Sequence, residues 1–407
     1  MNEEISEKNK TAKLQNLPEG WKWVRLGEVI GENNKSHLKV EDVDNDGNYP
    51  FFTSGGNILK HSSALIDGEN LFLSTGGSFY VYYYKGKASY STDTYSIRSK
   101  IETKLLYYIL CRKINYITFR FFIGSGLEHL QKDDFKSSFF FIFPESLPEQ
   151  QKIAEILETV DNAIEKTDQI IEKYKRIKQG LMQELLTKGI DEKGKIRTEK
   201  THHFKASPIG RIPEEWEVKR LGEVGVITMG LSPKSFMINN EQRGLPFLQG
   251  NAEFSSRYPQ PISWIEQPIK VAPTNSILIS VRAPVGALNL SDREYCIGRG
   301  LASIKPDKDY LIIYFLWYVL HLHKDNLIKL GQGSTFEAIG SKELYIFLLP
   351  LPPLPEQQRI AEILSQIDEV IEKETQYRDK LKRLKAGLMQ DLLTGKVRVN
   401  KLIKQGA

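Results

Sequence analysis

The chain has 407 residues, enough for two to four domains of roughly 100–200 residues each. It is 40% hydrophobic and 26% charged with a net charge of +5, as in a soluble, mildly basic folded protein that is compatible with a polyanionic partner. Two cysteines exclude a disulfide framework, the longest apolar run is about half of what spans a bilayer, and the polar N-terminus is no secretory signal, so we expect a cytoplasmic protein that does not enter a membrane.

Residues 1–16 are charged, polar and without periodicity, and we expect a flexible tail there. A folded region then begins at Leu-Pro-Glu-Gly-Trp (17–21), and similar wording returns as Ile-Pro-Glu-Glu-Trp (212–216). Each copy opens a region with short β-rich runs, one apolar helix and a glycine turn. We therefore predict two α+β domains with mixed β-sheets, over residues 17–145 and 212–352.

The two domains share a frame, but their interiors differ. Predicted strands lie at residues 71–74, 81–84 and 139–143 in the first domain and at 277–281 and 344–349 in the second. Predicted helices lie at about 104–119 and 310–323, followed by glycine turns at 124–126 and 331–333. The first interior is rich in tyrosine and lysine and the second in arginine. We expect two copies of one architecture with different binding surfaces.

The stretch Leu-Pro-Glu-Gln-Gln opens a long helical pattern twice, at Leu147 and at Leu354, and each pattern runs to Leu-Leu-Thr. Such a long internal repeat makes the chain two halves of one plan. We predict spacer helices over residues 146–190 and 353–397, each roughly 60 Å long at 1.5 Å per residue. The remaining segments are a linker over residues 191–211 and a tail over residues 398–407.

Apolar residues in both helices recur in alternating steps of four and three, which predicts an antiparallel coiled coil. Polar residues, Lys178 and Lys385 among them, weaken this seam. Gly180 and Gly387 lie inside the helices at a cost of about 1 kcal/mol each against alanine, so we expect close helix-to-helix approach there. The predicted spacer and partner-binding residues are Ile153, Leu157, Val160, Ile164, Ile171, Tyr174, Gly180, Leu181, Ile360, Leu364, Ile367, Ile371, Leu381, Gly387 and Leu388.

The apolar face is wider than a two-helix seam requires, which predicts additional partner helices. The flanking residues are Ile156, Ala163, Ile170 and Ile177 in the first helix and Ile363, Val370, Tyr377 and Leu384 in the second. Each helix also carries a basic band, interpreted as a solvated face or as a surface near a bound polyanionic partner. Its members are Lys173, Lys175, Arg176 and Lys178, and Lys380, Lys382, Arg383 and Lys385.

Helices of the form L-P-E-Q-Q-x-I-A-E-I-L that end in G-L-M-Q-x-L-L-T, each after a domain opened by I/L-P-x-x-W, resemble the specificity (S) subunit of type I restriction-modification systems. The likeness covers about residues 17–397, and residues 279–286 and 296–301 have the wording of a target-recognition domain. It implies that each domain reads one half of a gapped site in double-stranded DNA. It also implies that the helices set the gap and hold two methyltransferase (M) subunits, which restriction (R) subunits join.

The resemblance implies a non-catalytic subunit without a cofactor of its own, with S-adenosylmethionine, ATP and Mg²⁺ on partner subunits only. Basic and aromatic side chains in β-rich loops suit contacts with phosphates and base edges. The predicted DNA-binding residues are Lys60, Ser78, Tyr80, Lys85, Lys87 and Tyr90 in the first domain and Arg257, Arg282, Arg293 and Arg299 in the second.

Two other classes of function are open on the sequence. A two-domain protein-interaction scaffold with a coiled-coil spacer would have the same repeat. A fused methyltransferase or nuclease is disfavoured, because the chain contains neither an Asn/Asp-Pro-Pro-Tyr/Phe tetrapeptide nor an Asp…Asp/Glu-x-Lys arrangement after a convincing strand. The missing phosphate-binding loop argues against an ATP-driven motor. Phe-Ile-Gly-Ser-Gly (122–126) is interpreted as a turn, and the histidines lack partners at metal-ligand spacing, so we predict no metal site.

Overall fold

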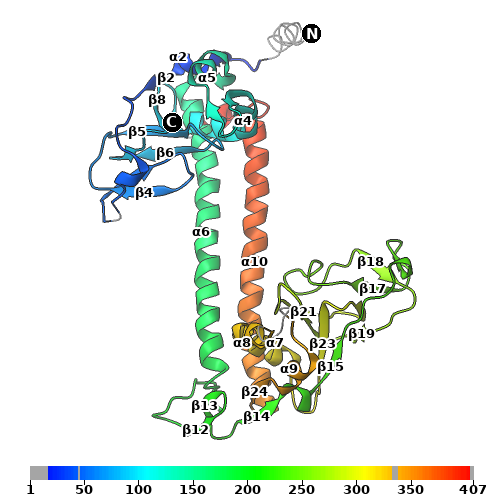
Figure 1. Cartoon of the computed structure of the whole chain (residues 1–407). Helices are drawn as coiled ribbons and strands as arrows, with labels where there is room; N and C mark the ends of the chain where they lie inside the picture. Colours follow the sequence, from blue (N-terminus) through cyan, green and yellow to red (C-terminus); the bar gives the residue numbers. More distant parts are fainter. Residues whose placement is uncertain (1–16, 45, 332–337, 404–407) are drawn as a thin grey trace. The chain divides into compact units, whose positions relative to one another are not determined.

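The computed structural model describes residues 17–44, 46–331 and 338–403 (Figure 1). By their internal contacts the residues form two compact units, Met1–Asp168 with Gln376–Ala407 (unit 1) and Gln169–Thr375 (unit 2). The tail predicted over residues 1–16 lies outside the described residues. Each unit contains one α+β domain and a part of both long helices.

Unit 1 is built on two small sheets. The first is antiparallel, in the order β2-β8-β5-β6, and comprises Ile30–Glu32, Thr94–Ser99, Glu69–Ser74 and Val81–Lys85. The second has the order β4-β3-β7, comprises Ile58–His61, Tyr49–Phe52 and Ser89–Tyr90, and pairs β3 with β7 in parallel. Smaller elements are α2 (Leu26–Val29), η1 (Val40–Asp42), β9 (Phe122–Ile123), β10 (His129–Leu130) and α5 (Lys132–Ser138).

Strand β5 shows why these residues form a two-sided sheet. Side chains of a strand alternate between its faces, and Leu71 and Leu73 pack in the main core of the unit whereas Phe72 packs in a second cluster. There the ring of Phe72 stacks on that of Phe52 with 4.0 Å between centroids. Both faces of β5 are therefore buried, which matches its continuous apolar run.

The ends of the first domain meet, since β1 (Trp21–Arg25) pairs antiparallel with β11 (Phe140–Pro144). The strand predicted at residues 139–143 is thus confirmed. The helix predicted at 104–119 is two helices, α3 (Thr103–Arg112) and α4 (Ile114–Phe121), which break at Lys113.

Unit 2 repeats this plan, with a larger second sheet. Its antiparallel sheet β15-β23-β20-β21 comprises Gly225–Met229, Leu301–Pro306, Ile277–Ser280 and Leu288–Leu290. Its second sheet, β16-β18-β17-β22-β19, comprises Ile238–Asn239, Ser263–Ile265, Leu245–Leu248, Tyr295–Ile297 and Val271–Ala272, with β17 and β22 parallel. Two further strand pairs are the hairpin of β12 (Phe204–Ser207) with β13 (Gly210–Pro213) and the pair of β14 (Glu217–Arg220) with β24 (Leu348–Leu351).

The short helices of unit 2 are η2 (Leu221–Glu223), η3 (Ser235–Met237), α7 (Ile313–Leu322), α8 (Lys324–Gly331) and α9 (Ser341–Ile346).

The last predicted strand of this domain, residues 344–349, is partly wrong. Its first residues belong to α9, and the strand begins only at Leu348, where pairing with β14 at Arg220 starts. Most of the turn predicted at 331–333 lies outside the described residues.

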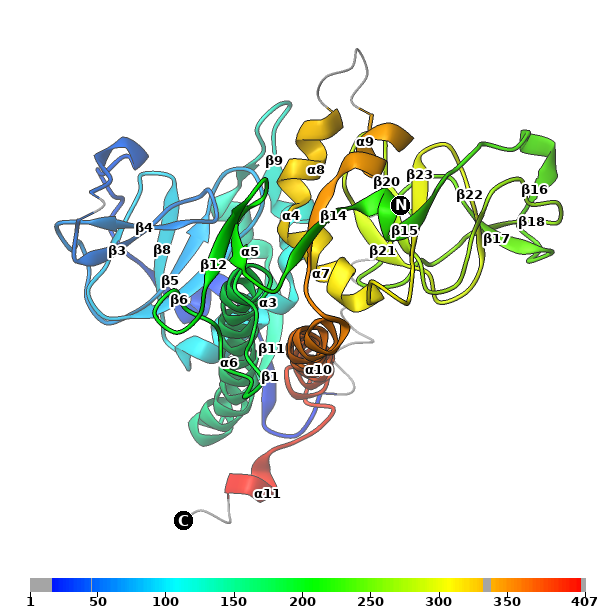
Figure 2. The same cartoon turned by 90° about the horizontal axis from the view of Figure 1, so that it is seen from below.

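The two long helices are confirmed as α6 (Leu147–Leu185) and α10 (Leu354–Leu392), each 39 residues long, although each ends five residues before the end of its predicted range. Within each unit their segments run antiparallel and side by side (Figures 1 and 2). The predicted seam residues Ile153, Leu157, Val160, Ile171, Ile360, Leu364 and Leu381 are buried, and Ile164, Tyr174, Leu181, Ile367, Ile371 and Leu388 are half-buried. A final short helix, α11, spans Asn400–Ile403.

Close approach of the two helices at Gly180 and Gly387 is not observed. Beyond its chain neighbours and its own helix backbone, a Cβ atom added at either glycine would meet none of the described residues within 4 Å, and both glycines are exposed. The described contacts between the helices, such as that of Lys178 with Asp368, are made by other residues, so the expectation is wrong for contacts among the described residues.

Candidate nucleic-acid interface

Three loops of unit 2 meet at one end of its two sheets. They follow β15 at residues 230–232, follow β17 at Gln249, and join β22 to β23 at residues 298–300. The hydroxyl of Ser232 links them, because it accepts hydrogen bonds from Nε2 of Gln249 at 3.2 Å and from the backbone N–H of Arg299 at 3.4 Å. We call these loops the second loop cluster.

Two glycines allow this close approach. A Cβ atom at Gly230 would collide with the carbonyl oxygen of Gly298, and one at Gly298 would lie 2.9 Å from the carbonyl oxygen of Gln249. A larger residue at either position would force the loop backbones apart. The loops therefore form one shaped surface that exposes the amide of Gln249.

Two of the four predicted arginines lie at this cluster. Arg299 is in the turn itself, and Arg282 follows Val281, whose N–H donates to the carbonyl oxygen of Gly300 at 2.9 Å. Both arginine side chains are exposed, and within the described part of the chain neither takes part in an ion pair. A guanidinium without an internal partner can donate two parallel hydrogen bonds to a guanine edge or a phosphate.

The other two predicted arginines lie at the opposite end of the same sheet. Arg257 accepts a backbone hydrogen bond from Leu290 at 2.8 Å, and its guanidinium lies over the ring of Tyr314 at 5.0 Å. Arg293 forms an ion pair with Asp292 at 3.4 Å. The structure thus brings together only half of the predicted arginine set.

Unit 1 has an equivalent cluster at the corresponding end of its sheets. Thr75, after β5, donates from Oγ1 to the carbonyl oxygen of Asp93 at 2.6 Å. The N–H of Thr75 donates to Oγ of Ser54, after β3, at 3.1 Å. We call these residues and the β5–β6 connection the first loop cluster; it presents hydroxyl groups where the second presents an amide and two guanidinium groups.

Ser78 and Tyr80, both predicted, lie in the first loop cluster. The hydroxyl of Ser74 donates to the carbonyl oxygen of Ser78 and accepts from the N–H of Tyr80, each at 2.7 Å, and the two predicted side chains are exposed. The hydroxyl of Tyr82 donates to the carbonyl oxygen of Gly56 at 2.5 Å. These bonds fix the shape of the connection.

The remaining residues predicted in this domain lie elsewhere. Lys85, at the opposite end of the β5–β6 pair, forms an ion pair with Glu69 at 3.0 Å, and Lys60 and Lys87 are exposed away from the cluster. The prediction for Tyr90 is wrong: its ring is 3% exposed, and its hydroxyl donates to a backbone carbonyl at 2.5 Å. The physical reason is that β7 pairs with β3 in the second sheet, which places the ring of Tyr90 in the buried cluster of Phe52 and Phe72.

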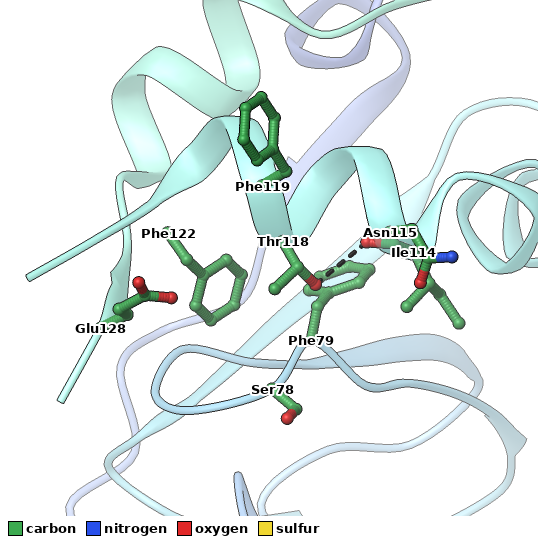
Figure 3. A pocket seen from close by; sticks show the side chains of 8 residues that line it. All are labelled: Ser78, Phe79, Ile114, Asn115, Thr118, Phe119, Phe122 and Glu128. Carbon is green, nitrogen blue, oxygen red and sulfur yellow. Dashed lines mark hydrogen bonds between the residues drawn. The ribbon is translucent and has the colours of Figure 1, made fainter.

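A cavity of about 580 Å³ opens beside the first loop cluster (Figure 3). The β9–β10 hairpin is joined to the cluster by hydrogen bonds from Leu130 to Thr75 at 2.9 Å and from Gly77 to Glu128 at 3.0 Å. Figure 3 shows the rings of Phe79 and Phe122 facing the cavity and the 89% exposed Phe119 pointing away from it. The lining residues are Ser78, Phe79, Ile114, Asn115, Thr118, Phe119, Phe122 and Glu128, with one carboxylate among them.

The described residues were compared with the requirements of a metal site and of a reactive thiol. Among them, no three or more His, Cys, Asp or Glu side chains are grouped as a metal site would require. Cys111 and Cys296 are free thiols, and burial raises the pKa of Cys111 to about 11. None of the helices described is both long and apolar enough to span a membrane.

A buried ion pair, not predicted above, lies at the start of each long helix. Glu149 in the first turn of α6 meets Arg398 at 2.7 Å, and Glu356 in the first turn of α10 meets Arg197. Each arginine ends a repeated tetrapeptide, Gly-Lys-Ile-Arg (194–197) or Gly-Lys-Val-Arg (395–398), and this repetition is the signal that could have revealed the pairs. In each unit the arginine that follows one helix is thereby joined to the glutamate that begins the other.

The sequence of this chain is similar to a known family and to known proteins. A family model described as type I restriction modification DNA specificity domain matches residues 18–176 and 213–383. A putative type I restriction enzyme MjaX specificity subunit of Methanocaldococcus jannaschii is 44% identical over 255 residues, which cover 62% of this chain and 58% of that protein. The type I restriction enzyme MjaVIII specificity subunit of the same organism is 28% identical over 416 residues and 95% of each chain.

Solved structures agree in fold. The S subunit of a type I restriction-modification system from M. genitalium matches with a TM-score of 0.69 at 15% identity over 93% of this chain and 96% of that one, which shows the fold alone. A chain from a structure on complex assembly and conformational transition of the type I R-M system is 27% identical, with a TM-score of 0.57 over 94% of this chain and 100% of that one.

Proposed function

The chain belongs to the type I restriction modification DNA specificity family, and on this premise we propose that each of its recognition domains reads one half of a bipartite, gapped site in double-stranded DNA. The observation that carries the proposal is the pair of loop clusters. They occupy equivalent places in two similar domains, yet they present different polar groups. Two different surfaces on one frame suit two different half-sites.

The chemistry of each cluster supports base reading. An exposed amide such as Gln249 can pair with the major-groove edge of adenine, and Arg282 and Arg299 can pair with guanine. The hydroxyls and the exposed Tyr80 of the first loop cluster can donate or accept at several bases or at phosphates. The exposed lysines farther from the clusters suit phosphate contacts, which add affinity without sequence preference.

The helices supply matched surfaces for a partner that is present twice. Tyr377 and Leu384, each 51% exposed, lie on α10 in unit 1, and Ile170 and Ile177, each 39% exposed, lie on α6 in unit 2. These pairs occupy the same positions of the internal repeat. We infer that each docks a helical segment of one methyltransferase (M) subunit, so that the complex contains two.

The proposal leaves catalysis to the partners. We infer that this chain is the non-catalytic subunit of a cytoplasmic complex. The methyltransferase subunits would carry S-adenosylmethionine, and the restriction (R) subunits, recruited later, would carry ATP and Mg²⁺. Methyl transfer by this chain alone would contradict that assignment.

One experiment tests the function. The chain is co-expressed with the genomic neighbour that encodes a methyltransferase, and methylated adenines are mapped across the host genome. The expected motif has two specified parts separated by a fixed unspecified gap, and a continuous motif would refute the proposal. DNA binding that does not weaken with rising salt would instead favour a protein-interaction scaffold.

A further inference from the structure

The two lysines that interrupt the helical seam have specific partners. Lys385 on α10 forms an ion pair with Asp161 on α6 at 2.5 Å in unit 1, and Lys178 on α6 forms one with Asp368 on α10 at 2.6 Å in unit 2. All four side chains are between 23% and 31% exposed. Such partly buried charges are less screened by water than surface ion pairs.

A tyrosine from the recognition domain completes each pair. The hydroxyl of Tyr108 on α3 donates to Oδ2 of Asp161 at 2.8 Å while the lysine binds Oδ1 of the same carboxylate. The hydroxyl of Tyr318 on α7 donates to Oδ2 of Asp368 at 2.7 Å, and again the lysine binds Oδ1. The two arrangements use the same atoms, and we call them the Tyr–Asp–Lys triads.

Ring contacts tighten each triad. Lys385 lies over the ring of Tyr108 at 5.6 Å, and Lys178 lies over the ring of Tyr318 at 5.4 Å. Both tyrosines are almost fully buried, at 3% and 1% exposure. Each triad therefore joins three elements: one long helix through its aspartate, the other through its lysine, and the recognition domain through its tyrosine.

The triads hold the helices in a single register. From Asp161 to Asp168 the chain advances seven positions along α6, and their partners Lys385 and Arg378 lie seven positions apart in the reverse direction along α10. The pair of Lys178 with Asp368 obeys the same antiparallel relation. Both units thus pair the two helices in the same register.

Other registers would separate these charges. A slide of α10 by one heptad in one direction places both triad lysines opposite alanines and brings Asp161 opposite Arg378. A slide in the other direction places Asp161 opposite Leu392 and Lys178 opposite a threonine, and leaves only Lys385 opposite a carboxylate, that of Asp168. Each slide thus leaves one ion pair where the observed register has three, Lys385 with Asp161, Arg378 with Asp168 and Lys178 with Asp368. Apolar seam residues tolerate such slides, whereas polar groups at seam positions select one register at some cost in stability.

We propose that the Tyr–Asp–Lys triads are positioning residues that hold each recognition domain at one place along the helix pair and thereby determine the number of base pairs between the two half-sites. This inference rests on the proposed function. The tyrosine belongs to the domain and the aspartate to the helix. A shift of the domain along the helices would therefore break the hydrogen bond to the same carboxylate whose ion pair with lysine fixes the register. Gap selection then follows from a few polar contacts in addition to helix length.

The test uses the full chain assembled with its methyltransferase partner. Methylation rates are measured on duplexes with the native gap and with gaps one base pair shorter and longer. The double variant Tyr108→Phe/Tyr318→Phe removes only the hydroxyl link to each aspartate. We expect the preference for the native gap to fall by roughly tenfold or more, since hydrogen bonds to charged groups contribute about 1.5–3 kcal/mol.

Lysine variants provide a matched comparison. Lys178→Met should weaken the gap preference in the same way. Lys152→Met, which removes an ion pair of 3.0 Å to Glu155 on the same helix and lies outside the basic band, should leave the preference unchanged. The inference fails if the tyrosine and Lys178 variants keep the wild-type ratio of rates, even if their melting temperatures fall. If the wild-type complex modifies no bipartite site, the proposed function itself has failed.

Discussion

Arg398 donates two hydrogen bonds to the buried carboxylate of Glu149, from Nε at 2.7 Å and from Nη2 at 2.9 Å, although 249 positions separate the two residues in the chain. The side-chain hydrogen bond with Glu149 raises the pKa of Arg398. The pair joins the start of α6 to the segment that follows α10, and thus closes unit 1.

Loss of this arginine should destabilise unit 1 strongly. Arg398→Met leaves the Glu149 carboxylate, 4% exposed, without its main partner, and breaking a buried pair on one side costs about 3–5 kcal/mol. In urea unfolding of the isolated chain, the transition of unit 1 should show this loss of unfolding free energy. Lys396→Met removes an exposed pair with Asp391 and should change the unfolding free energy by less than about 1 kcal/mol. Equal effects of the two changes would contradict this account.

Base reading by unit 2 should depend on Arg282 and Arg299 and not on Arg257 or Arg293. Alanine at Arg282 or at Arg299 should reduce the discrimination between bases at one position of one half-site by about 1–3 kcal/mol. Alanine at Arg257 or Arg293 should leave the motif intact, since these side chains lie on an aromatic ring or in an ion pair. Motifs obtained by methylation mapping of the four variants provide the comparison. A changed motif in the Arg257 or Arg293 variant alone would place the reading surface at the other end of the sheet.

The two exposed helix glycines should be replaceable in the free chain. Gly180→Ala and Gly387→Ala introduce a Cβ atom into open space and should each stabilise the chain by up to about 1 kcal/mol through helix propensity. Thermal unfolding of the single and double variants measures this gain. A decrease in stability would show that the helices approach each other there in solution. Weaker binding of the methyltransferase partner by these variants would place the glycines at its interface.

Unit 2 should lose stability on mild acidification. Burial lowers the pKa of His321 below 6.5, and burial has the same effect on His323. The unfolded chain therefore binds protons that the folded chain does not, so the unfolding free energy falls as the pH drops below about 6.5 and is constant above it. Unfolding measured between about pH 7.5 and 5.5 should show a smaller slope in His321→Gln than in the wild type. His37→Gln, at an exposed position, is the matched control, and an equal loss of slope there would refute the assignment.

The sequence predicts the parts of this molecule that depend on local periodicity. The four-three spacing of apolar residues, as from Ile153 to Leu185, and the proline in each first turn are sufficient to predict the two long helices. The spacing also shows that Lys178 interrupts a seam, but not that Asp368 meets it, because that partner lies far away in the chain. Tyr90 and Tyr80 look alike in sequence, and only the pairing of β7 with β3 buries the first of them. The separation of Arg257 from Arg282 likewise depends on strand order, which residue spacing does not encode.

The ion pair between Glu149 and Arg398 also bears on how the chain folds as it leaves the ribosome. Unit 2 is one continuous stretch, Gln169–Thr375, whereas unit 1 needs both Met1–Asp168 and Gln376–Ala407. Domains generally fold as units in the order in which they are synthesised. Here the domain made first must wait for residues 376–407, which are made after unit 2, before its unit is complete. The domain made second can therefore finish folding before the first.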